Sequence, residues 1–159
     1  MANYSTTLSK LRANIESAPE RLAGFTNRYN VLYSDVALST ATGSTDTVTV
    51  TLGTTPTLWV VDQCAAVVKT AFAGTGGLTI QVGTSGTTNA FLAAGSVLSA
   101  GLIQNSGGFS SVNTPSSSTS TSSATMVALF TNSTSGSPSA LTAGELDIYL
   151  SLLDLARLG

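Results

Sequence analysis

The sequence predicts an all-β protein, an antiparallel β-sandwich preceded by a short helical segment. Three observations lead to this prediction. After residue 30, apolar and hydroxyl-bearing residues alternate with a period of two over several stretches. Turn-forming Gly, Pro, Asn and Ser residues separate those stretches. Before residue 30, apolar residues recur at helical spacing, and no alternation of strands with helices follows.

The first predicted element is a helical arm over residues 1–30. Leu8, Leu11 and Ile15 lie at helical spacing, and Pro19 ends or interrupts the helix. A helix of this length is marginal alone, so it needs a surface on which to lie. We expect the arm to bind a partner through its apolar and basic side chains, namely Leu8, Leu11, Arg12, Ile15, Arg21 and Arg28.

The β-sandwich domain is predicted over residues 31–159. In 46–52, Val48, Val50 and Leu52 alternate with threonines, as expected for a half-buried antiparallel strand. In 144–153, leucine and isoleucine alternate in the same way with Glu145, Asp147, Tyr149 and Ser151. Further strands are expected over 31–38, 58–72 (bent or bulged), 78–82 and 124–131, with a strand or short helix over 91–98 and one or two weak strands in 102–112.

Turn signals connect these strands. The glycines of the segment GTGG at 74–77 predict a tight reversal, which makes 58–72 and 78–82 a hairpin. The Ser/Thr-rich segments 110–123 and 132–140 are expected to be exposed loops. The total of seven or eight strands fits an immunoglobulin-like or a jelly-roll-like sandwich. The strand count and the long connections favour the jelly roll.

The chain carries unusually little charge. Charged residues make up 9% of it, with a net charge of −2 and none between Ala71 and Gly144; soluble domains typically have about 25%. The hydrophobic content of 42% allows a core, so the surface must be coated with hydroxyl groups. So little charge gives weak protection against self-association. We therefore expect a homo-oligomer whose copies cover much of this surface.

The composition excludes most catalytic and metal sites. Without histidine the chain cannot form Ser-His-Asp or Cys-His systems, and a single cysteine, Cys64, cannot form a zinc site or an internal disulfide. Glu145 and Asp147 share a strand face and could bind calcium or act as glycosidase carboxylates. A solvated or subunit-facing surface is the simpler interpretation of that pair. We therefore expect no enzyme activity, cofactor or metal.

Nucleic acid, sugar and membrane are not the expected partners. From residue 31 onward the only cations are Lys69 and Arg157, whereas phosphate binding needs clustered basic residues. Trp59 and the phenylalanines are expected in the core rather than on a sugar-stacking platform. No apolar run of about 18 residues could cross a bilayer, and the first ten residues lack the apolar core of a signal peptide.

Two segments resemble small head proteins of tailed bacteriophages: VVDQCAAVVKTAFAGTGGLTIQVGT at 60–84 and LTAGELDIYLSLLDL at 141–155. The resemblance covers about 40 residues and concerns strand and turn positions, with no catalytic signature. It implies a jelly-roll-like decoration, or cement, protein on the outer surface of a capsid, made in the host cytoplasm. Such proteins bridge major capsid subunits and are often homotrimers. The helical arm lies outside the shared pattern.

Three other functions remain open at this point. A tail or fibre protein would bind host-surface glycan through exposed aromatic residues. A main capsid or tube subunit would assemble alone into shells or tubes. A glycosidase would need two carboxylates placed across a cleft. The capsid decoration protein is the favoured interpretation because it requires only surfaces and assembly.

Overall fold

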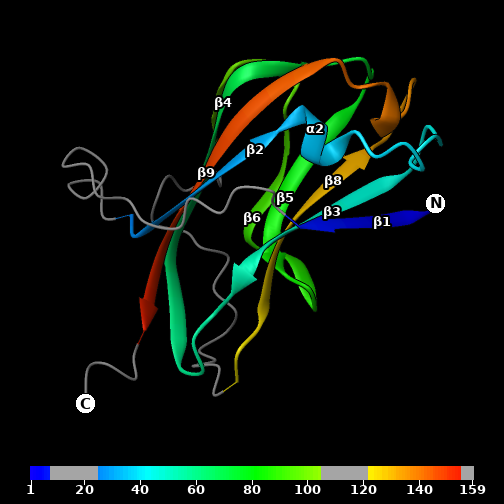
Figure 1. The fold of residues 1–159 in the computed structure, drawn as a ribbon. Helices are drawn as coiled ribbons and strands as arrows, with labels where there is room; N and C mark the ends of the chain where they lie inside the picture. The colour runs from blue at the N-terminus through cyan, green and yellow to red at the C-terminus, as the bar shows by residue number, and fades with distance from the viewer. Residues whose placement is uncertain (8–24, 105–121, 155–159) are drawn as a thin grey trace.

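The computed structural model describes residues 1–7, 25–104 and 122–154, and it shows a mostly β protein with two sheets (Figure 1). In chain order the strands are β1 (Asn3–Thr7), β2 (Asn27–Leu32), β3 (Thr47–Thr54), β4 (Trp59–Ala73), β5 (Leu78–Thr84), β6 (Thr87–Ser96), β7 (Gly101–Ile103), β8 (Thr125–Asn132) and β9 (Ala143–Asp154). Two short helical turns, α2 (Tyr33–Val36) and η2 (Pro138–Ala140), lie in the connections. No helix among these residues is long and apolar enough to cross a membrane. The prediction of an all-β protein is confirmed.

The two sheets have different strand orders. The five-stranded sheet runs β1-β3-β8-β5-β6, and the four-stranded sheet runs β2-β9-β4-β7. All pairs between described strands are antiparallel except β1 with β3, which is parallel over five residues. Consecutive strands therefore often lie in different sheets, and most pairings join segments that are distant in the chain.

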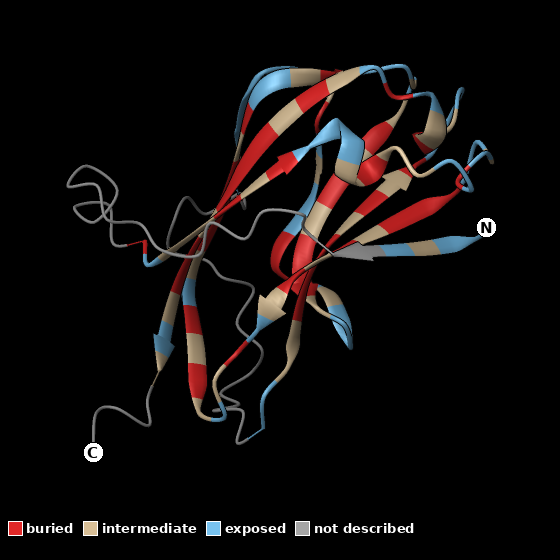
Figure 2. Ribbon diagram, in the orientation of Figure 1, coloured by how far each residue is buried: buried red, intermediate tan, exposed pale blue. Residues whose placement is uncertain are grey.

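The core lies between the two sheets, where alternate residues of each strand are buried (Figure 2). In β9 the buried residues Leu146, Ile148 and Leu150 point inward, as the period-two pattern predicts. Two aromatic contacts fill this space: the Trp59 and Phe91 rings meet edge to face at 5.9 Å, and Phe72 and Phe130 lie 5.8 Å apart. Such pairs add to the stabilisation that burial itself provides.

Gly144 is required where β9 crosses the core aromatic residues. Its φ of +145° is rarely adopted by residues with a side chain. A Cβ atom at this position would lie 2.5 Å from two atoms of the Phe72 ring. Both the backbone conformation and the close ring contact therefore select glycine here.

Most strand predictions are confirmed, including the long bulged strand at 58–72, the strand at 124–131 and the strand rather than helix at 91–98. The strand expected over 31–38 is wrong in its position. The observed β2 begins at Asn27 and ends at Leu32, and the chain then turns through α2, where Asp35 accepts a hydrogen bond from the Leu32 N–H at 2.9 Å. This capping interaction ends the strand and starts the helical turn.

The hairpin predicted at 74–77 is also wrong. The turn joins β4 of one sheet to β5 of the other, and β5 pairs instead with β6 and β8. The glycines allow the turn to lie against the loop that follows β8: Gly76 donates a backbone hydrogen bond to the Ser135 carbonyl at 2.8 Å. The turn residues predict a reversal of the chain, and such a reversal occurs both in a hairpin and in a connection between two sheets.

The expected helical arm is described only at its two ends. Residues 3–7 form β1 and residues 27–30 belong to β2, so both ends contribute strands to the sheets. Tyr29 is only 2% exposed and belongs to the core. The expected boundary between residues 30 and 31 therefore divides a strand. The predicted helix, with Leu8, Leu11, Arg12, Ile15 and Arg21, lies outside the described residues.

Candidate interaction surfaces

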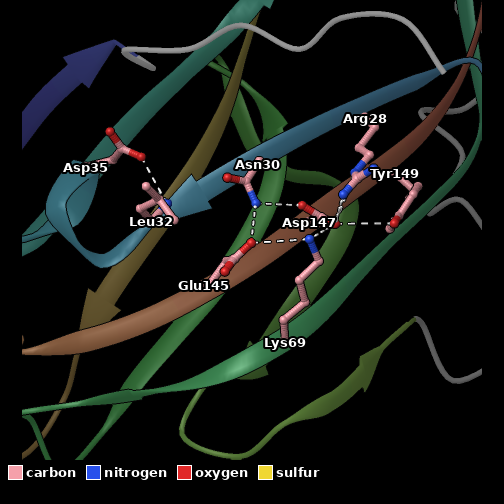
Figure 3. A network of polar contacts seen from close by, with 8 residues as sticks. All are labelled: Arg28, Asn30, Leu32, Asp35, Lys69, Glu145, Asp147 and Tyr149. Carbon is pink, nitrogen blue, oxygen red and sulfur yellow. Dashed lines mark hydrogen bonds and ion pairs between the residues drawn. The ribbon is translucent and has the colours of Figure 1, made fainter. Parts of the chain in front are cut away.

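A cluster of polar side chains occupies the outer face of the four-stranded sheet (Figure 3). Three strands contribute to it: Arg28 and Asn30 from β2, Glu145, Asp147 and Tyr149 from β9, and Lys69 from β4. We refer to these six residues as the ion cluster.

The register of the strands brings the ion cluster together. Asn30 lies directly opposite Asp147, and Arg28 lies opposite Tyr149, so each pair shares one face of the sheet. On the other side of β9, the pairing with β4 shifts between Val68 and Thr70. Lys69 is the residue at this bulge, and its side chain reaches the carboxylates of β9.

Asp147 is the centre of the cluster, and its side chain is fully buried (0% exposed). Its Oδ2 atom lies 2.7 Å from Nη2 and 3.0 Å from Nε of Arg28, and 2.6 Å from Nζ of Lys69. Asn30 donates from Nδ2 to Oδ1 at 2.8 Å, and the Tyr149 hydroxyl donates to Oδ2 at 3.4 Å. A buried carboxylate is costly unless it is paired and hydrogen-bonded, and this one meets both conditions.

Glu145 completes the charge balance. Its Oε1 atom accepts hydrogen bonds from Asn30 at 3.0 Å and from Lys69 at 3.2 Å, while its side chain remains 36% exposed. The cluster thus holds two cations and two anions with zero net charge. The guanidinium of Arg28 also lies 5.9 Å from the centre of the Tyr149 ring, a cation–π arrangement. The cluster therefore holds its strands together without presenting a net charge to an ionic ligand.

The pKa shifts of Asp147, Glu145 and Lys69 all favour the ionised form of the side chain. Burial raises the pKa of Asp147, but hydrogen bonds from its cationic and amide neighbours outweigh burial and hold the pKa below its usual value. Hydrogen bonds from Asn30 and then Lys69 lower the pKa of Glu145. Burial lowers the pKa of Lys69, but hydrogen bonds to the two carboxylates outweigh this effect and raise it overall.

These directions restrict the chemistry that the cluster can perform. A glycosidase needs one carboxylic acid with a raised pKa as proton donor, whereas both carboxylates here are shifted downward. Formation of an amide bond between Lys69 and Asp147 would need an uncharged amine and a protonated carboxyl group, and the shifts favour the opposite states. The cluster is thus suited to holding strands together rather than to proton transfer.

The outer face of the five-stranded sheet is the second surface, and its chemistry is different. None of the residues in β1, β3, β8, β5 and β6 is charged. Thr49 of β3 lies opposite Leu129 of β8, which lies opposite Gln81 of β5. The hydroxyl and amide groups bond to one another: Thr49 Oγ1 donates to Asn3 Oδ1 at 3.0 Å, and Gln81 donates to Thr88 Oγ1 at 3.1 Å. We call this surface the neutral face.

The remaining candidate residues lie in the core. Trp59 is buried, and its Nε1 donates to the Ser122 carbonyl at 3.2 Å. Phe72, Phe91 and Phe130 are also buried, so none of these rings offers a sugar-stacking platform, and Phe109 lies outside the described residues. Burial raises the pKa of the Cys64 thiol, which keeps it protonated and unreactive. Among the described residues, no group of three or more Cys, Asp or Glu residues could hold a metal ion.

Arg28 is the one predicted partner-binding residue that the structure describes, and its side chain is engaged within the chain by Asp147. The roles of Asn30 and Lys69 were not predicted from the sequence. Arg28 and Asn30 are two residues apart, as are Glu145 and Asp147, so each pair shares one face of its strand. This shared spacing is the sequence signal that could have indicated contact between the two pairs. Comparisons with known protein families, curated proteins and solved structures found no match to this chain.

Proposed function

We propose that this chain is a non-catalytic structural protein of a virus particle, a capsid decoration (cement) protein that bridges major capsid subunits. One observation carries the proposal: every strand of the five-stranded sheet lacks charge, whereas four of the six charged residues in the strands of the other sheet form a self-neutralised cluster. Such a molecule is adapted to contact neighbours over neutral surfaces. The resemblance of residues 60–84 and 141–155 to phage head proteins points in the same direction.

The mechanism would be mechanical. Copies pack against one another and against the capsid through many weak hydroxyl, backbone and apolar contacts. Several such contacts on one oligomer, a trimer in this proposal, add up through multivalency, because each one holds the others at high local concentration. A neutral face removes the like-charge repulsion that would otherwise separate identical copies.

The proposed fold is a jelly roll, and the strand pairing supports it. With β1 set aside, the remaining eight strands pair first with last (β2 with β9), second with seventh (β3 with β8), third with sixth (β4 with β7) and fourth with fifth (β5 with β6). An eight-stranded antiparallel ribbon that is folded in half and rolled up produces this pairing. In this scheme β1 is an addition to the edge of one sheet.

The proposed tether to the capsid is restricted to residues 8–24. Both ends of the expected arm lie in strands, so only this middle segment, with Leu8, Leu11, Arg12, Ile15 and Arg21, is assigned to the tether. We retain the helical arm as part of the proposal for these residues. Arg28 is withdrawn from the partner-binding set because Asp147 already binds it.

The test uses particles of the virus that encodes the chain. Cryo-EM maps of heads assembled with and without it should show extra density on the outer surface at joints between capsid subunits. Heads that lack the chain should release their DNA at a lower temperature. Density confined to the tail, or a shell or tube made of this chain alone, would overturn the proposal in favour of a fibre protein or a main subunit respectively.

A further inference from the structure

We infer that β1 is an exchangeable strand: in the assembled protein, Asn3–Thr7 of one copy completes the five-stranded sheet of a second copy. The inference rests on the self-association that is part of the proposed function. It specifies which segment is donated, which edge receives it, and that the partner is another copy of this chain.

The receiving edge is built entirely from β3 and the loop before it. The Ala2 carbonyl accepts hydrogen bonds from the Thr47 backbone N–H at 2.8 Å and from Thr47 Oγ1 at 3.1 Å. The Ala2 N–H donates to Asp46 Oδ1 at 3.3 Å, and Asn3 Oδ1 accepts a hydrogen bond from Thr49 at 3.0 Å. Each of these interactions would be the same whichever copy supplied the strand.

The carboxylate of Asp46 is held in place for this contact. It is buried, and its Oδ2 accepts a hydrogen bond from the Gly43 N–H at 2.8 Å. A Cβ atom at Gly43 would lie 2.6 Å from Asp46 Oδ1, so glycine is what allows the loop to approach so closely. The eight-stranded body thus positions the acceptor for Ala2 independently of β1.

The other eight strands do not need β1 for their own pairing. β1 pairs with β3 alone, and in parallel orientation, whereas β2 to β9 all pair among themselves. A short edge strand of this kind opens at a lower free energy than the whole domain. Opening would leave the charge-free edge of β3 unpaired and expose Tyr4, which now packs against the core. Such an edge favours pairing with a new strand.

The chain between the two elements is long enough for exchange. Residues 8–24 number 17 and can span up to about 56 Å when extended. The radius of gyration expected for a domain of this length is about 15 Å. β1 can therefore reach an adjoining copy, and because neither β1 nor β3 is charged, no like-charge repulsion arises between the two strands. Neighbours on one particle would meet at local concentrations on the order of 1 mM, which favours exchange.

Disulfide trapping tests the exchange on the purified full chain. Ser5 of β1 lies directly opposite Thr49 of β3, a separation that suits a disulfide. Both residues are replaced by cysteine in a Cys64→Ala background. One sample carries Ser5→Cys and Thr49→Cys in the same chain. A second sample co-expresses Ser5→Cys and Thr49→Cys on separate chains with tags of different length, and both samples are oxidised at on the order of 1 mM protein.

With the two variants mixed equally and at random, exchange predicts that about half of the co-expressed chains form a disulfide-linked heterodimer and that the single-chain variant forms linked multimers. The control pairs Ser5→Cys with Thr87→Cys, which lies on β6 at the opposite edge of the sheet, and reports random collisions. The inference is overturned if the single-chain variant closes internally while the co-expressed pair stays at the control level. It is equally overturned if neither sample forms a disulfide. Failure of the proposed function would appear separately, as absence of the chain from heads.

Discussion

Replacing Asp147 with asparagine should reveal how much the ion cluster contributes to the stability of the sandwich. The substitution keeps the shape of the side chain and one oxygen that can accept from Asn30. It removes the negative charge and places an NH₂ group against donors from Arg28 and Lys69. A fully buried carboxylate that binds two cations would thus become a neutral amide facing like donors.

The magnitude follows from the exposure of the surviving partners. Removing one member of a buried ion pair costs about 3–5 kcal/mol when the other is left buried and unpaired. Here the side chains of Arg28 and Lys69 are 30% and 36% exposed and can turn to water, and Lys69 keeps Glu145. This reduces the expected loss to about 2 kcal/mol. In a chain of this length, such a loss lowers Tm by roughly 4–8 °C.

Urea denaturation and calorimetry would measure the loss, with Glu145→Gln as the matched control on the same strand face. We expect the control to change the free energy of unfolding by less than about 0.5 kcal/mol because its side chain is partly solvated. A double-mutant cycle with Lys69→Met should show a coupling of about 1 kcal/mol with Asp147→Asn. An Asp147→Asn protein with a Tm within about 1 °C of the unsubstituted chain would refute the reasoning.

Four further predictions concern the same structure. The pKa of Asp147 is lower in the folded chain than the unfolded value of about 3.9. The stability that the Asp147 carboxylate contributes is therefore present above about pH 3.9 and is lost as the pH falls through the folded pKa. Below about pH 4 the urea midpoint should fall more steeply for the unsubstituted chain than for Asp147→Asn. Gly144→Ala should cost about 2–4 kcal/mol in urea denaturation because of its φ and the Phe72 ring, whereas Gly86→Ala, which has open space, should stay within about 0.5 kcal/mol. Intact mass spectrometry should give the unmodified mass of the chain, since Lys69 and Asp147 remain an ion pair and form no amide bond. A chain that is lighter by one water, and in which the peptides of β4 and β9 stay joined after proteolysis, would contradict this prediction. A Gly/Ser linker in place of residues 8–24 should keep the Tm and the β-sheet circular dichroism of the domain, should lose any helical signal of the arm, and should lower the occupancy of the chain on heads. Deletion of residues 1–30 should instead unfold the domain, because Tyr29 is a core residue. Full occupancy with the linker would exclude the tether.

The sequence was sufficient to predict strands whose two faces differ. In β3 and β9, alternation of apolar and polar residues follows directly from burial of one face, so strand, face and approximate ends were all predicted. The long strand β4 could be predicted despite its three register shifts against β9, because a long apolar run rich in β-branched residues favours a strand. β1 was missed, since five residues with a single partly buried ring, Tyr4, carry little periodic signal.

Pairing between strands was harder to predict than the strands themselves. The glycine turn at 74–77 specifies a reversal, but whether β5 pairs with β4 depends on β8, about 50 residues further along the chain. The ion cluster was also hard to predict because it depends on which strands pair. That Glu145 and Asp147 share a face could be predicted, whereas their partners Arg28 and Asn30 lie more than a hundred residues earlier and meet them only through the pairing of β2 with β9.

The position of the ion cluster has a mechanical consequence for the proposed tether. A pull transmitted through residues 8–24 reaches the folded domain at both ends of that segment, through β1 and just before β2, and both of these are edge strands. Edge strands detach most easily, but here Thr26 bonds with the backbone of Leu150 and Leu152, and Arg28 and Asn30 join β2 to Asp147. Asp147 in turn binds Lys69 of β4, so load on the edge strand is shared across three strands. Four of the eight charged residues that the structure describes thus lie where a tethered sandwich would otherwise open first.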